Sequence, residues 1–142
     1  MSFEQVVFPQ VTFFYFAMLV FLYFHLTLGV TTLRAIKKRE FGANDNRMDM
    51  AVRAHAQFFE YAPIITLMVA GLEMSGVERT SIHWLMGILL LGRFSHCAAF
   101  WLPQHSIAYW TGRAIGNVSN LGLLITSSVW GIARFMPAGI SG

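Results

Sequence analysis

Four stretches of this chain are apolar over the length that a helix needs to cross a lipid bilayer. They run from about Phe8 to Val30, from Met50 to Met74, from Ile82 to Leu102 and from Arg113 to Met136. A spanning helix needs roughly 20 mostly apolar residues, because the hydrocarbon core is about 30 Å thick. The pattern predicts an all-α integral membrane protein, a four-helix transmembrane bundle, with one domain over residues 1–142.

Charge and cysteine content narrow the functional classes. Charged residues make up 12% of the chain, about half the share found in soluble domains. The net charge of +3 comes mainly from basic residues crowded into one connection, which indicates membrane topology and no nucleic-acid partner. Cys97 is the only cysteine, so no disulfide can form within the chain, and the sequence shows no metal-ligand spacing around it.

The basic residues also predict the orientation. The connection between the first two spans and its flanks hold Arg34, Lys37, Lys38, Arg39 and Arg47. Because basic loops stay on the cytoplasmic side, this connection and the third one are predicted to be cytoplasmic, with both termini outside.

Polar side chains inside the spans mark the candidate site, because ionisable groups in lipid are costly and usually face a cavity or another polar group. Arg53, Gln57 and Glu60 in the second span fall at i, i+4 and i+7, which is one helical face. Counting residues places Glu60 and Arg93, from the antiparallel third span, at a similar depth. We therefore predict an ion pair between Glu60 and Arg93.

The fourth span repeats the pattern with Arg113, Asn117 and Asn120. Three helices thus place polar groups in the cytoplasmic half of the bundle, as expected for a site that binds a polar ligand.

Each of these groups also has a purely structural interpretation. Arg53 can extend to water or to lipid phosphate, and a Glu60–Arg93 pair can serve only to hold helices together. Asn117 and Asn120 can bond between helices, and His96 can be a packed, hydrogen-bonded core residue. His25 and Cys97 are interpreted as structural, Cys97 as a small buried residue.

Three motifs resemble a known family. The second span contains Arg53-Ala-His-Ala-Gln-Phe-Phe-Glu60-Tyr61-Ala-Pro63, the third contains Gly92-Arg93-Phe-Ser-His96, and the fourth opens with Arg113-Ala-Ile-Gly116. They are similar, in order and spacing, to motifs of MAPEG, the membrane-associated proteins in eicosanoid and glutathione metabolism. The resemblance covers almost the whole chain and is greatest to bacterial-type, microsomal glutathione S-transferase-like members.

The resemblance implies a homotrimer with glutathione as cosubstrate, bound between subunits near the cytoplasmic face. In a bacterial inner membrane such a protein is expected to work in detoxification. It would join glutathione to hydrophobic small molecules that arrive through the lipid bilayer, or reduce lipid hydroperoxides. Arg113 would stabilise the thiolate as the catalytic residue, and the glutathione contacts would come from Arg34, Arg53, Gln57, Glu60, Tyr61, Arg93, His96 and Asn117.

The sequence departs from the family pattern at three positions, and two other functions remain open. Gln57 stands where the family usually has asparagine, and His96 and Phe100 stand where eicosanoid-type members carry tyrosines. Phe100 cannot donate a hydrogen bond. These differences motivate the alternative of a non-catalytic lipid-binding or scaffold protein. The charges inside the second and third spans motivate a third possibility, a small transporter or channel subunit.

Overall fold

The chain forms four helices and, within the described residues, no strand. The computed structural model describes residues 8–37, 46–103 and 106–136. Its helices are α1 (Gln10–Lys37), α2 (Asn46–Met74), α3 (Arg79–Phe100) and α4 (Ile107–Phe135). The predicted all-α four-helix architecture is confirmed. Lys38 and Arg39 of the basic connection lie outside the described residues.

The helices extend beyond the apolar stretches, most clearly at α1 and α4. α1 continues seven residues past Val30, and α4 begins six residues before Arg113. Apolarity marks the part of a helix that can lie in lipid, whereas a helix continues wherever its backbone bonds are satisfied. At the start of α4 the Ser106 hydroxyl accepts a hydrogen bond from the Tyr109 N–H at 3.1 Å, which is a helix N-cap. The predicted start of the fourth helix was therefore wrong.

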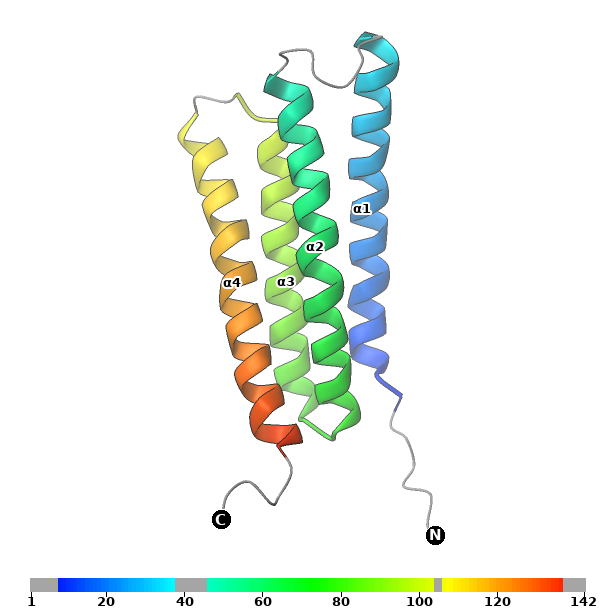
Figure 1. Cartoon of the computed structure of the whole chain (residues 1–142), viewed down its shortest axis with the longest axis vertical. Helices are drawn as coiled ribbons and strands as arrows, with labels where there is room; N and C mark the ends of the chain where they lie inside the picture. Colours follow the sequence, from blue (N-terminus) through cyan, green and yellow to red (C-terminus); the bar gives the residue numbers. More distant parts are fainter. Residues whose placement is uncertain (1–7, 38–45, 104–105, 137–142) are drawn as a thin grey trace.

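α2 and α3 form the centre of the bundle (Figure 1). Each contacts the other three helices, whereas α1 and α4 lie on opposite sides of the central pair and do not contact each other. The chain runs up and down, so that the first residue of α1, the α2–α3 turn and the last residue of α4 lie at one end of the bundle. The last residue of α1, the first residue of α2, the last residue of α3 and the first residue of α4 lie at the other end, which we call the connection end.

Two of the four helices, α1 and α3, are long and apolar enough by composition to cross a membrane, over Gln10–Ile36 and Arg79–Ala99. α2 and α4 have sufficient length, since 29 residues extend about 43 Å. α2 carries several charged residues within its helix, and these lower its apolar character.

The α2–α3 turn is fixed by a glycine and an arginine. Gly76 has φ 85°, a left-handed conformation that favours glycine. The Gly76 N–H donates to the Glu73 carbonyl at 3.1 Å and the Val77 N–H to the Leu72 carbonyl at 3.2 Å, which together form a Schellman cap. Arg134 from α4 donates to the Ser75 carbonyl at 2.6 Å. Gly76 therefore marks the end of α2.

Glu73 caps a different helix from the one it belongs to. Its carboxylate accepts from the backbone N–H groups of Val11 at 3.0 Å and Thr12 at 2.9 Å, and from the Thr12 hydroxyl at 2.6 Å. These N–H groups lie in the first turn of α1 and have no acceptor within that helix. Glu73 is 4% exposed, so a negative charge at the positive end of α1 is held away from water.

α3 and α4 approach closely through small residues. A Cβ built on Gly92 would lie 2.8 Å from the Ser119 Cβ, and one built on Gly116 would lie 2.8 Å from the His96 Cβ and 3.0 Å from the Gly92 carbonyl oxygen. The Ser95 hydroxyl donates to the Gly112 carbonyl at 3.3 Å. Small residues at such spacing are typical of helix pairs that pack in a membrane.

The α1 cap predicts that Glu73→Ala destabilises the bundle by about 1–3 kcal/mol, because two backbone donors and one hydroxyl lose their acceptor in a buried place. Unfolding of the detergent-solubilised protein followed by circular dichroism measures this. Glu78→Ala is the matched control, since Glu78 is exposed and its side chain makes no cap bond; its effect should stay within about 0.5 kcal/mol. Equal effects of the two variants would contradict the cap.

The α3–α4 contact predicts opposite effects for two glycine substitutions in α4. Gly116→Ala should destabilise by about 1–3 kcal/mol, because the new methyl group meets His96 and the Gly92 backbone. Gly122→Ala meets nothing within 4 Å and should stabilise by up to about 1 kcal/mol through helix propensity. Thermal unfolding compares them, and a stabilised Gly116→Ala protein would show that the two helices are not in such close contact.

Candidate functional site

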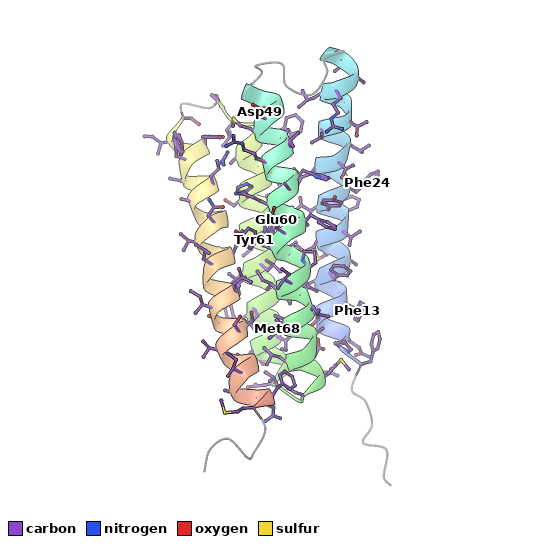
Figure 2. The ribbon with its side chains drawn as sticks, in the orientation of Figure 1. Phe13, Phe24, Asp49, Glu60, Tyr61 and Met68 are labelled. Atoms are coloured by element: carbon purple, nitrogen blue, oxygen red, sulfur yellow. The ribbon has the colours of Figure 1, made fainter. Side chains whose placement is uncertain are left out.

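The polar face predicted on the second helix lies on the outside of the bundle. Arg53 and Glu60 are exposed and Gln57 is half-buried. Glu60 lies on the side of α2 that faces the viewer in Figure 2. No helix of the described chain covers this polar face of α2, which consists of Arg53, Gln57 and Glu60.

The predicted Glu60–Arg93 ion pair does not form. Glu60 is exposed, whereas Arg93 is 1% exposed and its three side-chain nitrogens have no hydrogen-bond partner within the described structure. The two residues do lie at a similar depth, because the Arg93 guanidinium packs against Tyr61, the neighbour of Glu60. Counting residues gave the depth correctly, but the direction of each side chain around its helix depends on packing.

Aromatic rings surround Arg93 in place of a carboxylate. Its guanidinium carbon lies 5.3 Å from the Phe58 ring centroid and 5.7 Å from that of Tyr61. A desolvated cation–π contact contributes about 2 kcal/mol, which is less than the cost of burying a charge without an opposite charge. Arg93 is therefore a buried cation whose charge the described residues compensate only in part. Tyr61, predicted to bond a ligand through its hydroxyl, contributes its ring to Arg93.

Two further buried polar groups lie on α3 and α4. His96 packs against Gly116, and its Nδ1 has no hydrogen-bond partner in the described part of the chain. Asn120 is also buried, and its Oδ1 is likewise without a partner among the described residues. Both were considered as core residues that bond within the bundle. His96 interacts with the backbone of Arg113 on α4, whereas Asn120 Oδ1 makes no such bond within the described residues.

The predicted polar face of the fourth helix lies at the boundary between core and surface. Arg113 is half-buried, Asn117 is exposed and Asn120 is buried. The three side chains therefore lie on the same side of α4 but differ in how deeply they are buried. Asn117 is available to a partner outside the subunit, whereas Asn120 is not.

Arg113 is held by an aromatic hydroxyl that the sequence reading missed. Its Nη1 donates to the Tyr109 hydroxyl at 2.7 Å, and its guanidinium carbon lies 5.5 Å from the Tyr109 ring centroid. The Tyr109 hydroxyl in turn contacts the Met50 sulfur of α2 at 3.6 Å. The i, i+4 spacing of Tyr109 and Arg113 could have indicated this contact, but Tyr109 lies before the predicted start of the helix.

The helix N-terminus adds little to the stabilisation of an anion at Arg113. α4 begins at Ile107. Arg113 lies six residues further on, about 9 Å along the axis, and the field of a helix terminus is effective within the first turn. Any stabilisation of an anion must come from the guanidinium itself.

The structure separates the predicted site residues into two groups within one subunit. Arg53, Gln57 and Glu60, with the exposed Arg34 of α1, lie on the outside. Arg93, His96 and Tyr61 lie inside or partly inside, with Arg113 at the α4 edge. The side chain of Phe100 is outside the described set, and the described residues contain no group of three or more His, Cys, Asp or Glu side chains that could hold a metal.

Comparisons with known proteins agree with this architecture. The inner membrane protein YecN of Escherichia coli strain K12 is 27% identical over 93 residues, which are 65% of this chain and 66% of the relative. The protein of the same name from Escherichia coli strain CFT073 matches equally. The match thus spans just under two thirds of the length of these relatives. No solved structure matches the chain significantly. The model of the MAPEG family matches residues 12–133, from the first turn of α1 almost to the end of α4, and the chain therefore belongs to the MAPEG family of membrane proteins.

Proposed function

We propose that this protein is a membrane-bound, glutathione-dependent transferase or peroxidase that acts on lipophilic electrophiles or lipid hydroperoxides. All four helices cross the membrane in this proposal, and three copies assemble into a homotrimer. The connection end of the bundle faces the cytoplasm of a bacterial cell in this proposal, because the sequence that joins α1 to α2 and its flanks are rich in basic residues.

The observation that carries the proposal is the uncovered polar face of α2. Arg53 and Glu60 project from a bundle whose remaining surface is largely apolar. Exposing these charges to hydrocarbon would be costly, so they require a polar partner outside the subunit. A neighbouring copy with a polar ligand between the two subunits satisfies this need, and Asn117 and Arg113 at the α4 edge are suited to face that ligand.

Glutathione has the charges that this arrangement requires. It carries two carboxylates, one ammonium group and a thiol. Arg53 can bind one carboxylate with two parallel hydrogen bonds, and Arg34, near the end of α1, can reach the other. Glu60 is the acceptor for the ammonium group, and the Gln57 amide adds a neutral hydrogen bond.

Arg113 supplies the cation that the chemistry needs. A free thiol has a pKa of about 8.5, and a nearby cation lowers it so that thiolate is present at neutral pH. The Tyr109 hydroxyl fixes the guanidinium, which reduces the reorganisation required when the anion forms. The thiolate sulfur then forms a bond to the electrophilic carbon while the leaving group departs with its electron pair. With a hydroperoxide, the sulfur attacks the terminal oxygen and the O–O bond breaks, so that the alkoxide leaves and takes up a proton to give the alcohol. A second glutathione then attacks the resulting sulfenic acid, which forms the disulfide and releases water.

One observation favours the alternative of a non-catalytic lipid-binding or scaffold protein. His96, which replaces a tyrosine of the eicosanoid-type pattern, is buried against Gly116 and does not face the outside of the subunit. Saturable lipid binding without glutathione-dependent turnover would support this alternative.

Calorimetry with glutathione tests the binding site. The detergent-solubilised protein should bind saturably, and Arg53→Ala should weaken binding by about 10- to 100-fold, because a charge-assisted hydrogen bond to a carboxylate is lost. Arg79→Ala is the matched control, since Arg79 is exposed at the opposite end of the bundle. Absence of binding to well-folded protein, or equal losses in both variants, would contradict the site.

The role of Arg113 is tested by the ionisation of bound glutathione. Arg113→Gln should move the thiol pKa upward, toward the free value of about 8.5, so that turnover falls at neutral pH and recovers as pH rises. The thiolate absorbance of the complex, titrated with pH, measures the shift. Tyr109→Phe should produce a smaller shift in the same direction. An unchanged titration in Arg113→Gln would remove Arg113 from the catalytic role.

A further inference from the structure

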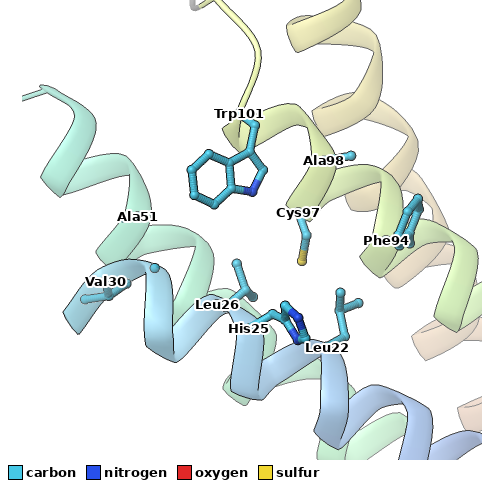
Figure 3. A pocket seen from close by; sticks show the side chains of 10 residues that line it. Leu22, His25, Leu26, Val30, Ala51, Phe94, Cys97, Ala98 and Trp101 are labelled. Atoms are coloured by element: carbon cyan, nitrogen blue, oxygen red, sulfur yellow. The ribbon is translucent and has the colours of Figure 1, made fainter. Parts of the chain in front are cut away.

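A crevice between α1 and α3 lies apart from the polar face of α2. Its inner part encloses about 290 Å³ and is closed by Ala51 of α2, Trp101 and Cys97, whose sulfur points into the space (Figure 3). Its outer part, about 680 Å³, continues along the surface from Leu22 toward Phe14. The two parts share Leu22, His25 and Phe94, so they are adjacent along α1 and α3.

The walls and location of the crevice determine the kind of molecule that fits. α1 and α3 are the two helices apolar enough to cross a membrane, so the outer part opens toward lipid when they do. The lining is almost entirely aliphatic and aromatic, and both volumes are of the size found for ligand sites. One turn of a helix about 10 Å wide fills roughly 400 Å³, so the inner part is too small for a helix of a second copy. A single acyl chain is narrow enough.

His25 adds a polar group to these apolar walls. Its Nδ1 lies 3.2 Å from the carbonyl oxygen of Phe21. A carbonyl oxygen only accepts, so Nδ1 carries the proton, and in the neutral ring Nε2 is an acceptor. His25 lies 15 residues into a helix of 28, about half-way along α1, where lipid offers no water to donate to that nitrogen.

We propose that the α1–α3 crevice binds an acyl chain that carries a hydroxyl or hydroperoxyl group part-way along its length. The O–H donates to His25 Nε2, and the terminal segment of the chain enters the inner part beside Cys97. A ketone or an epoxide would not suit the site, because neither can donate a hydrogen bond. The site rests on the membrane placement of α1 and α3 proposed above, but it requires neither glutathione nor Arg113.

Photo-crosslinking tests the site. A diazirine-labelled acyl methyl ester is added to the full-length protein in lipid nanodiscs without glutathione, and the labelled residues are mapped by mass spectrometry. Labelling should fall on α1 and α3 around Leu22 and Phe94. The methyl ester of a mid-chain hydroxystearate should compete about fivefold better than methyl stearate, as one neutral hydrogen bond allows. Stearic acid is added as a separate competitor, to test whether a carboxyl O–H can replace the mid-chain hydroxyl.

Two variants and a control separate the contributions. His25→Leu should keep crevice labelling but abolish the preference for the hydroxylated ester. Ala98→Trp, which fills the inner part, should abolish specific labelling, whereas Ile125→Trp on the exposed side of α4 should not. Labelling that spreads over α4 and does not respond to competitors would overturn the site. The finding that a second copy of the chain covers the crevice between α1 and α3 would overturn it as well. A preference retained in His25→Leu would overturn the role of His25. Glutathione turnover, measured separately, decides the proposed enzymatic function independently of these results.

Discussion

The close contact of α3 and α4 determines most of what the candidate site contains. Because Gly92 and Gly116 have no side chains, the two backbones come close enough to bury His96 between them. A thicker interface would move α4 outward and carry Arg113 away from α3. The same contact leaves Arg93 only the space beside α2, where Phe58 and Tyr61 lie. The positions of Arg93 and Arg113 therefore depend on residues that carry no charge.

The features predicted correctly from the sequence depend on the number of residues along a helix, and the features that were missed depend on how the helices pack against one another. The all-α architecture follows from the lengths of the apolar stretches, and the common depth of Glu60 and Arg93 follows from the helix rise per residue. The side chain of Arg93 turned inward and that of Glu60 outward because the α2–α3 packing decides which faces meet, and helical spacing in one segment does not contain that information. Glu73 caps α1 from 61 residues away, a long-range contact with no local sequence signal. Ser106 was a local signal, but it lies outside the apolar stretch that defined the span.

The two candidate sites use the surrounding lipid in opposite ways. The polar face of α2 is unfavourable in hydrocarbon, and the proposed function therefore covers it with a second copy and a charged ligand. The apolar lining of the α1–α3 crevice is favourable in hydrocarbon, so the crevice needs no assembly to cover it. An acyl chain that moves from lipid into the crevice gains no hydrophobic free energy, because both surroundings are apolar. It gains close packing and one hydrogen-bond acceptor instead. In the proposed function, a water-soluble thiol and a membrane-dissolved chain thus reach the same subunit by separate routes.

The burial of Arg93 favours an anion nearby. Its guanidinium has no hydrogen-bond partner in the described part of the chain, and two aromatic rings compensate only part of the cost of its burial. The polypeptide alone is thus in an electrostatically unfavourable state. An anion that binds near Arg93 removes part of the free-energy cost of burying the guanidinium. The apparent affinity of the protein for that anion includes the free energy recovered in this way. A ligand with carboxylates or a thiolate is therefore favoured over a neutral one of equal size, even where Arg93 does not touch it, because a charge in a low-dielectric interior acts over several ångströms.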